Sequence, residues 1–193
     1  PVRMSSDPTC MEANADGNLR FENYVVADGG LDNVFVYVKD GLGNYYFDAP
    51  AEPAKIDQQG CRYVPHVLGV RAGQPIEITN SDATMHNVHA LPDVNGEMNL
   101  AQFRQGQKDV RMFTAPEVMV PVKCDLHPWN YAYIGVFAHP YFAVTDEQGK
   151  FIIRGVPAGR HTLEIFHPKS GSSPKEVVVA DKPTNVDFDV KAR

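Results

Sequence analysis

Short apolar runs separated by Gly, Pro and Asp dominate this chain and predict β-strands rather than helices. In the run 31–38 both faces are apolar, which is typical of a buried strand. Over the first two thirds of the chain, the predicted strands are 31–38, 66–70, 74–79, 117–123 and 133–137. Helix signals are few, and we expect at most one or two helical turns at residues 99–105. The pattern therefore predicts an all-β fold.

The last fifty residues repeat this pattern with their own turn signals. We expect strands at 141–145, 150–153, 161–166, 176–179 and 186–190. In the last of these, Val186, Phe188 and Val190 alternate with two aspartates, which predicts a half-buried strand. The segment 170–174 is rich in Ser and Gly and predicts a loop. Strands at this spacing, with Gly and Pro in the turns, indicate a sandwich or a barrel.

Length and charge limit the classes of function that this chain can have. The chain has 193 residues, enough for one large domain or two small ones. Its net charge is −6, and no basic stripe is available to neutralise phosphates, so we expect no nucleic-acid partner. No apolar run approaches the roughly 20 residues that a transmembrane helix needs. No export signal is visible and the chain does not begin with Met, which is compatible with a processed protein.

The three cysteines have different expected roles. Cys124 is a candidate metal ligand, which leaves Cys10 and Cys61, each beside turn-forming residues. A disulfide between them is the simplest pairing; two buried free thiols are the alternative. The disulfide would close a loop of about fifty residues and stabilise the fold by roughly 4 kcal/mol. Disulfides favour an oxidising compartment, so we expect a periplasmic or secreted protein.

Two segments together indicate a mononuclear copper site. Cys124 and His127 share one short loop, and His86 follows the polar turn 80–82 about forty residues upstream. A thiolate with two neutral imidazoles and a weak axial ligand suits both Cu(I) and Cu(II). Zinc would prefer four strong ligands, and no clear fourth is present. A cysteine nucleophile would need a base and an orienting group, and no known signature of one appears.

His86 and His89 compete for the first imidazole position. Because they are three residues apart, a strand points them to opposite faces, so only one can face Cys124. We favour His86, which follows the polar turn and precedes Asn87. The Asn87 amide could tie the two ligand segments together.

These segments resemble the cupredoxins. The stretch from Asn80 to Val88 is similar to the plastocyanin and amicyanin segment that carries the first histidine, and Cys124-x-x-His127-Pro128-Trp129 is similar to the short amicyanin ligand loop. Further matches at 57–58, 65–67 and 141–145 are similar to bacterial plastocyanin-like proteins linked to methylamine utilisation. The resemblance implies a Greek-key β-sandwich that binds one copper ion through His86, Cys124 and His127.

The axial position departs from the cupredoxin pattern. Asn130 stands where the family has Met. Its carbonyl oxygen would be a harder donor that favours Cu(II) and lowers the reduction potential. The alternatives are a three-coordinate ion, the backbone carbonyl of Met85 as axial ligand, or an Asn130 that only caps the loop.

The C-terminal part resembles a second module, the carboxypeptidase-regulatory or transthyretin-like β-sandwich. Its cues are the stretches 144–153 and 155–163, and the first strand typical of that module is found far upstream at 30–38. We therefore expect a cupredoxin domain at 51–139, inserted in or packed on a discontinuous Ig/transthyretin-like sandwich of residues 20–50 and 140–193. Residues 1–19 would be an N-terminal extension tied by the Cys10–Cys61 disulfide.

The resemblance implies an exported single-electron carrier, not an enzyme. In this hypothesis the edge of His127 passes electrons to a redox partner such as a cytochrome or an oxidoreductase. The rivals are a copper-storage or delivery protein and a non-redox binding module that keeps the cupredoxin fold.

Overall fold

The computed structural model describes residues 2–192, which form two compact units. The first contains residues 2–22 and 49–136, and the second contains residues 23–48 and 137–192. Nearly all regular structure in both units is β, which confirms the predicted all-β class. None of the described helices is long and apolar enough to cross a membrane.

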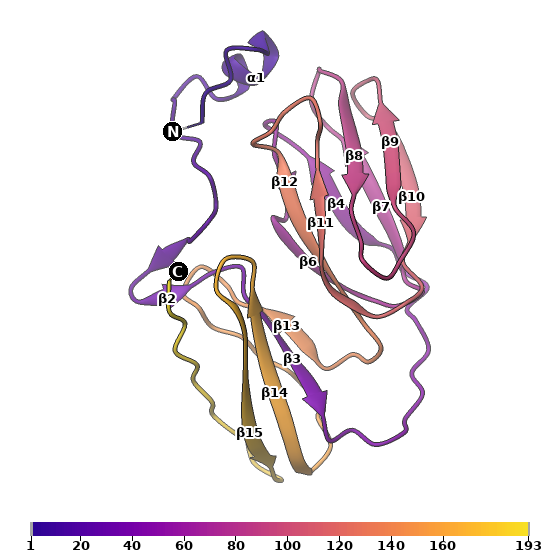
Figure 1. Ribbon diagram of the computed structural model, residues 1–193, viewed down its shortest axis with the longest axis vertical. Coiled ribbons are helices and arrows are strands. Elements are labelled where there is room, and N and C mark those ends of the chain that lie inside the picture. Colours follow the sequence, from indigo (N-terminus) through magenta and orange to yellow (C-terminus); the bar gives the residue numbers. More distant parts are fainter. Residues whose placement is uncertain (1, 193) are drawn as a thin grey trace. The chain divides into compact units, whose positions relative to one another are not determined.

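The first unit is built from two sheets (Figure 1). One has the order β10-β7-β4-β5, with bounds Lys108–Met112, Pro75–Asn80, Ala54–Gln58 and Tyr63–Val64. The other has the order β6-β12-β11-β8-β9, with bounds Val67–Arg71, Tyr131–Phe137, Glu117–Lys123, His86–Ala90 and Met98–Gln102. The β4–β7 pairing is parallel, whereas β11 pairs antiparallel with both β8 and β12.

Alternating apolar residues place these sheets around one core. Ile76 and Ile78 on β7 are buried, and so are Val120 and Val122 on β11 and Ile134 on β12. A strand points alternate side chains to one face, so each of these pairs faces the same interior. This core holds β8 and β11 side by side; the predicted ligand His86 begins β8, and the predicted ligand Cys124 directly follows β11.

The N-terminal segment is tied to the first unit by a disulfide. The expected Cys10–Cys61 bond is present. Cys10 lies in α1 (Pro8–Ala13), a short helix that begins after the N-cap Asp7 and has Pro at its first position. The predicted helix at 99–105 is wrong, because residues 98–102 pair with β8 as the edge strand β9.

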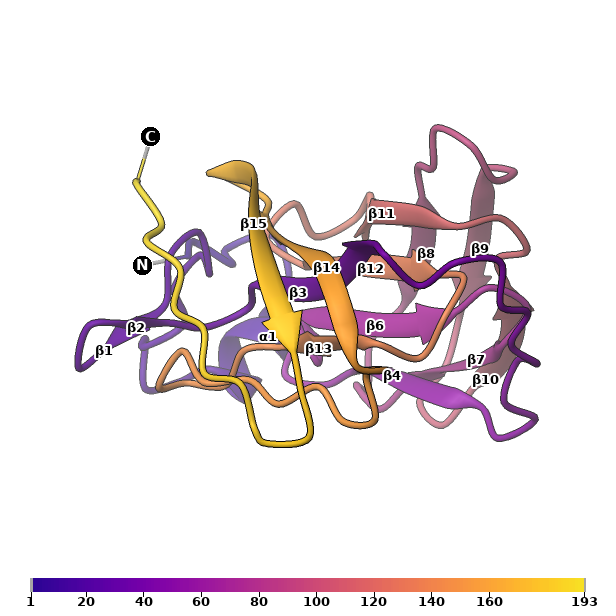
Figure 2. The same ribbon diagram turned by 90° about the horizontal axis from the view of Figure 1, so that it is seen from below.

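The second unit contains a sheet of order β13-β3-β14-β15. Its strands are Phe142–Val144, Phe35–Asp40, Gly159–His167 and Gly171–Val179. Strands β3, β14 and β15 lie side by side in both views (Figure 1, Figure 2). A separate short hairpin pairs β1 (Val26–Ala27) with β2 (Gly30–Leu31).

Three predictions for the second unit are wrong. The segments 150–153 and 186–190 contain no strand, and residues 171–174 belong to β15 rather than to a loop. Phe151 and Phe188 still pack beside the buried Val34, Val36 and Ile165. Alternation therefore identified which side chains are buried, but a strand also needs a neighbouring backbone for hydrogen bonds. The transthyretin-like assignment and the predicted domain boundaries stay predictions.

Candidate metal centre

A turn stabilised by side-chain hydrogen bonds connects β7 to β8 and ends at His86. The Asn80 side chain donates from Nδ2 to the Thr84 carbonyl at 2.9 Å, and its Oδ1 accepts the Asp82 N–H at 3.0 Å. Such side-chain bonds to nearby backbone favour turns over continued strand. His86, the first residue of β8, is fully buried.

The loop between β11 and β12 contains the predicted ligands Cys124 and His127. The Cys124 N–H donates to the Asn130 carbonyl at 2.9 Å, and the Asn130 N–H donates to the His127 carbonyl at 2.8 Å. The His127 N–H in turn donates to the Cys124 carbonyl at 3.3 Å. These bonds close a tight loop that turns the Cys124 and His127 side chains to the same side.

Three donor atoms meet at the ends of these segments. Cys124 Sγ lies 3.5 Å from His127 Nδ1 and 3.7 Å from His86 Nδ1, and the two Nδ1 atoms are 3.0 Å apart. A point about 2.0 Å from all three atoms lies at the centre of this triangle, close to the bond lengths that imidazole and thiolate make to first-row metal ions. No His, Cys, Asp or Glu of residues 2–192 adds a fourth ligand atom to this group. The donor set therefore fits a trigonal ion and lacks the tetrahedral set that structural zinc prefers.

Hydrogen bonds in the site favour the charged forms of these groups. Burial opposes ionisation of Cys124, but hydrogen bonds from His127, His86 and the Asn87 N–H outweigh it and lower the thiol pKa to about 6. Burial also opposes charging of His86, yet its bonds to Asp82 and Cys124 raise that pKa to about 9. At neutral pH these shifts favour a thiolate beside a protonated His86 in the copper-free site, and the thiolate is the form that binds metal.

Asn87 links the two ligand segments, as the sequence suggested. Its N–H donates to Cys124 Sγ at 3.4 Å, and its Oδ1 accepts the Asp125 N–H at 2.7 Å. The hydroxyl of the buried Tyr63 donates to the Asn87 carbonyl at 3.1 Å. These bonds hold β8 and the 124–130 loop in register.

Two carboxylates that the sequence reasoning missed hold the outer nitrogens of the histidines. His86 Nε2 lies 3.0 Å from Asp82 Oδ2, and His127 Nε2 lies 3.0 Å from Asp7 Oδ2. An ionised carboxylate only accepts hydrogen bonds, so each Nε2 carries a proton. Nδ1 of a neutral ring is then the nitrogen free to bind a metal. Asp82 was visible in the polar turn before His86, but nothing in the sequence connects Asp7 to His127.

The other candidate residues lie outside the donor triangle. His89 bonds to Asp125 at 2.9 Å and to Glu97 at 2.7 Å, away from Cys124. The Asn130 side chain donates to Gln58 Oε1 at 3.0 Å, and its buried Oδ1 has no hydrogen-bond partner among the described residues. Met85 is exposed beside His86.

The His127 edge that the hypothesis assigns to electron transfer is buried. Its side chain is only 3 % exposed, and Trp129 lies against it with ring centroids 5.3 Å apart. Trp129 itself packs in a buried cluster with Met4, Cys10 and Cys61. The N-terminal segment therefore covers the ring that the hypothesis assigns to electron transfer.

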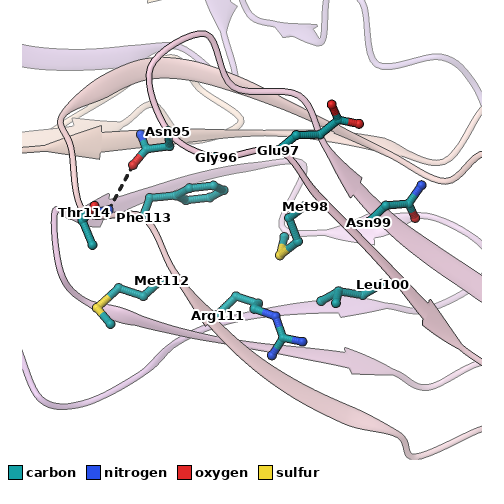
Figure 3. A pocket seen from close by; sticks show the side chains of 10 residues that line it. All are labelled: Asn95, Gly96, Glu97, Met98, Asn99, Leu100, Arg111, Met112, Phe113 and Thr114. Carbon is teal, nitrogen blue, oxygen red and sulfur yellow. Dashed lines mark hydrogen bonds between the residues drawn. The ribbon is translucent and has the colours of Figure 1, made fainter.

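A separate pocket of about 450 Å³ opens between β9 and β10 (Figure 3). Met98 and Leu100 from β9 line it with Met112 and Phe113, and Asn95 closes one end by accepting the Thr114 N–H at 3.0 Å. The lining contains no His or Cys and shares no residue with the donor triangle.

Comparisons with known proteins give fold-level likenesses. A Cu-containing nitrite reductase from Thermus scotoductus SA-01 is 21 % identical with a TM-score of 0.38, over 48 % of this chain and 25 % of that one. A purple cupredoxin from Nitrosopumilus maritimus is 20 % identical with a TM-score of 0.38, over 44 % of this chain and 99 % of that one. An amicyanin variant in its Cu(I) form is 23 % identical with a TM-score of 0.40, over 53 % of this chain and 98 % of that one.

No family model and no curated protein matches the sequence. The chain spans about a quarter of the nitrite reductase that it resembles. The three converging donor atoms, and not these likenesses, indicate a metal site.

Proposed function

We propose that the first unit binds one copper ion and cycles it between Cu(I) and Cu(II) as an exported single-electron carrier. His86 Nδ1, Cys124 Sγ and His127 Nδ1 are the proposed ligands. The observation that carries the proposal is their triangle of 3.0, 3.5 and 3.7 Å, closed by one soft and two borderline donors. Copper bound there would supply one-electron chemistry, and the protein's part is to hold the donors in a plane and keep water away.

The axial ligand proposed from the sequence is Asn130. A buried amide oxygen without a hydrogen-bond partner supports it, because such an atom is costly unless something else satisfies it. The backbone bonds of Asn130 also close the ligand loop, so the residue has a structural role in either case.

A copper-storage or delivery role is the second candidate. The burial of His127 and the contact of its Nε2 with Asp7 favour it, because a covered imidazole edge suits retention better than rapid exchange of electrons. The proposed partner is a cytochrome or oxidoreductase for the carrier, and a copper acceptor for the store. The proposed location is the periplasm or the extracellular space, which the disulfide supports.

Titration of the copper-free protein with Cu(II) tests the proposal. We expect saturation at one equivalent, with an intense visible band from thiolate-to-copper charge transfer that is lost in Cys124→Ser. A protein that stays colourless, or a Cys124→Ser variant that keeps the colour, would reject it. Reversible voltammetry of the loaded protein would favour the carrier, whereas tight Cu(I) binding without reversible cycling would favour the store.

A further inference from the structure

Both carboxylates that contact the histidines are attached to the same disulfide. Asp7 Oδ1 accepts the N–H of Cys10 at 3.0 Å, and Asp82 Oδ2 accepts the N–H of Cys61 at 2.8 Å. Each half-cystine sulfur also lies within 4.8 Å of its neighbouring carboxylate oxygen and of a nitrogen of the histidine that this carboxylate contacts. The disulfide thus joins two matching arms: one runs from Cys10 through Asp7 to His127, and the other runs from Cys61 through Asp82 to His86.

The arm that carries Asp7 belongs to a segment whose other attachments are polar contacts and one small buried cluster. At its end, Glu22 pairs with Arg62 at 3.5 Å and with His66 at 3.2 Å. Asp7 accepts the Thr84 hydroxyl at 2.8 Å, and the Asn14 side chain donates to the Gly60 carbonyl at 3.0 Å. Around Trp129, the buried contacts of this segment come from Met4 and Cys10, with Val2 and Leu19 partly buried. Loss of the crosslink would add the conformational freedom of about twenty residues to the open state. The position of Asp7 therefore depends on the bond to Cys61.

We propose that the Cys10–Cys61 disulfide is the positioning and closing device of the metal site. Through Asp7 it fixes the His127 ring with Nδ1 turned inward, it links this segment to the Gly60–Cys61 turn whose N–H groups hold Asp82 against His86, and it holds residues 2–22 over His127. This inference rests on the proposed copper site and names the feature that controls its geometry and the release of its metal. Metal leaves slowly while the disulfide is closed and quickly when it is absent.

A disulfide that only stabilised the fold would leave other signs. It would change unfolding but not the electronic environment or the exchange rate of a bound ion in the folded protein. Partners that orient metal-bound histidines, by contrast, typically change metal affinity about 10- to 100-fold when they are removed. Measurements on the folded protein therefore separate the two roles.

The first test compares Asp7→Asn and Asp82→Asn with Asp16→Asn. Asn caps a helix about as well as Asp, so Asp7→Asn removes the charge but keeps the helix cap and the disulfide. Asp16 is the matched control, because it lies in the same segment and bonds only within it, to Asn18. We expect the first two variants to shift the visible and electron paramagnetic resonance spectra of bound Cu(II) and to weaken binding about 10- to 100-fold, with Asp16→Asn like the wild type.

The second test replaces both cysteines, as Cys10→Ala with Cys61→Ala. Copper removal by an excess of a strong Cu(I) chelator should be at least tenfold faster than from the wild type after loading with Cu(I). Unchanged spectra and removal rates in folded Asp7→Asn and in the double variant would overturn the inference.

A copper-free measurement keeps this inference separate from the proposed function. In nitrogen-15 NMR spectra, both Nε2–H groups should be hydrogen-bonded and slow to exchange in the wild type. Both Asp7→Asn and the double variant should make the His127 signal exchange fast. A His127 signal that stays protected in both variants would contradict the inference. A wild-type protein without a thiolate–copper band would instead reject the copper proposal, and the NMR result would still decide the role of the disulfide.

Discussion

The double replacement of Cys10 and Cys61 by Ala should destabilise the first unit strongly and selectively. The crosslink joins residues separated by 51 positions. Closing a loop of that length removes unfolded-state entropy worth about 4 kcal/mol at 25 °C. With a urea slope of about 2 kcal/mol/M, the unfolding midpoint should fall by about 2 M.

Trp129 makes this prediction specific to one unit. It is the only tryptophan in the sequence and lies in the cluster that contains both half-cystines. Its fluorescence during urea unfolding of the copper-free protein therefore reports the first unit alone. Asp16→Asn is the control, because it changes the same segment and leaves the disulfide closed, and its midpoint should stay close to that of the wild type. Equal midpoints for the double variant and the wild type would show that the crosslink does not constrain the N-terminal segment.

Three further predictions concern the site itself. The Cys124 thiolate of the copper-free protein should persist down to a pH near 6, because the pKa of the thiol is lowered. The ultraviolet absorbance of the thiolate follows this titration, and a midpoint near the ordinary pKa of 9.0 would contradict the prediction. Because the Cys124 pKa is lower in the folded state, the stabilisation from its thiolate is complete above pH 9 and is lost as the pH falls through 6. The His86 pKa is higher in the folded state, so the stabilisation from its charged ring is complete below its ordinary pKa of 6.5 and is lost as the pH rises through 9. Asn130→Met should shift the visible spectrum and raise the reduction potential, and no change in either would show that Asn130 is not axial. Tyr63→Phe should cost about 1 kcal/mol in urea unfolding, because the buried Asn87 carbonyl loses its hydroxyl donor, and an unchanged midpoint would count against that bond.

The sequence predicted the central strands well because their burial and their backbone pairing coincide. The expected strand 117–123 is β11, and 74–79 differs from β7 by one residue at each end. The segment 186–190 shows the limit of the method. Its alternating residues pack inward, but no neighbouring backbone pairs with them, and a single sequence does not show which segments pair.

The inner part of the site could also be predicted, because His86, Cys124 and His127 sit at recognisable turns. Its outer part could not. Asp7 reaches His127 across 120 positions, and its segment is held there by the disulfide together with contacts to equally distant residues such as Thr84 and Trp129. The same long-range contact buries His127, so the edge expected to face a redox partner is covered. Local motifs therefore indicate which candidate ligands come together, whereas access to them depends on distant segments.

X-ray absorption spectroscopy of the protein loaded with one equivalent of copper tests the central claim most directly. The account predicts one short copper–sulfur bond from Cys124 and two copper–nitrogen bonds from His86 and His127, with the sulfur contribution absent in Cys124→Ser. A first coordination shell of nitrogen and oxygen alone, or one unchanged in Cys124→Ser, would contradict it.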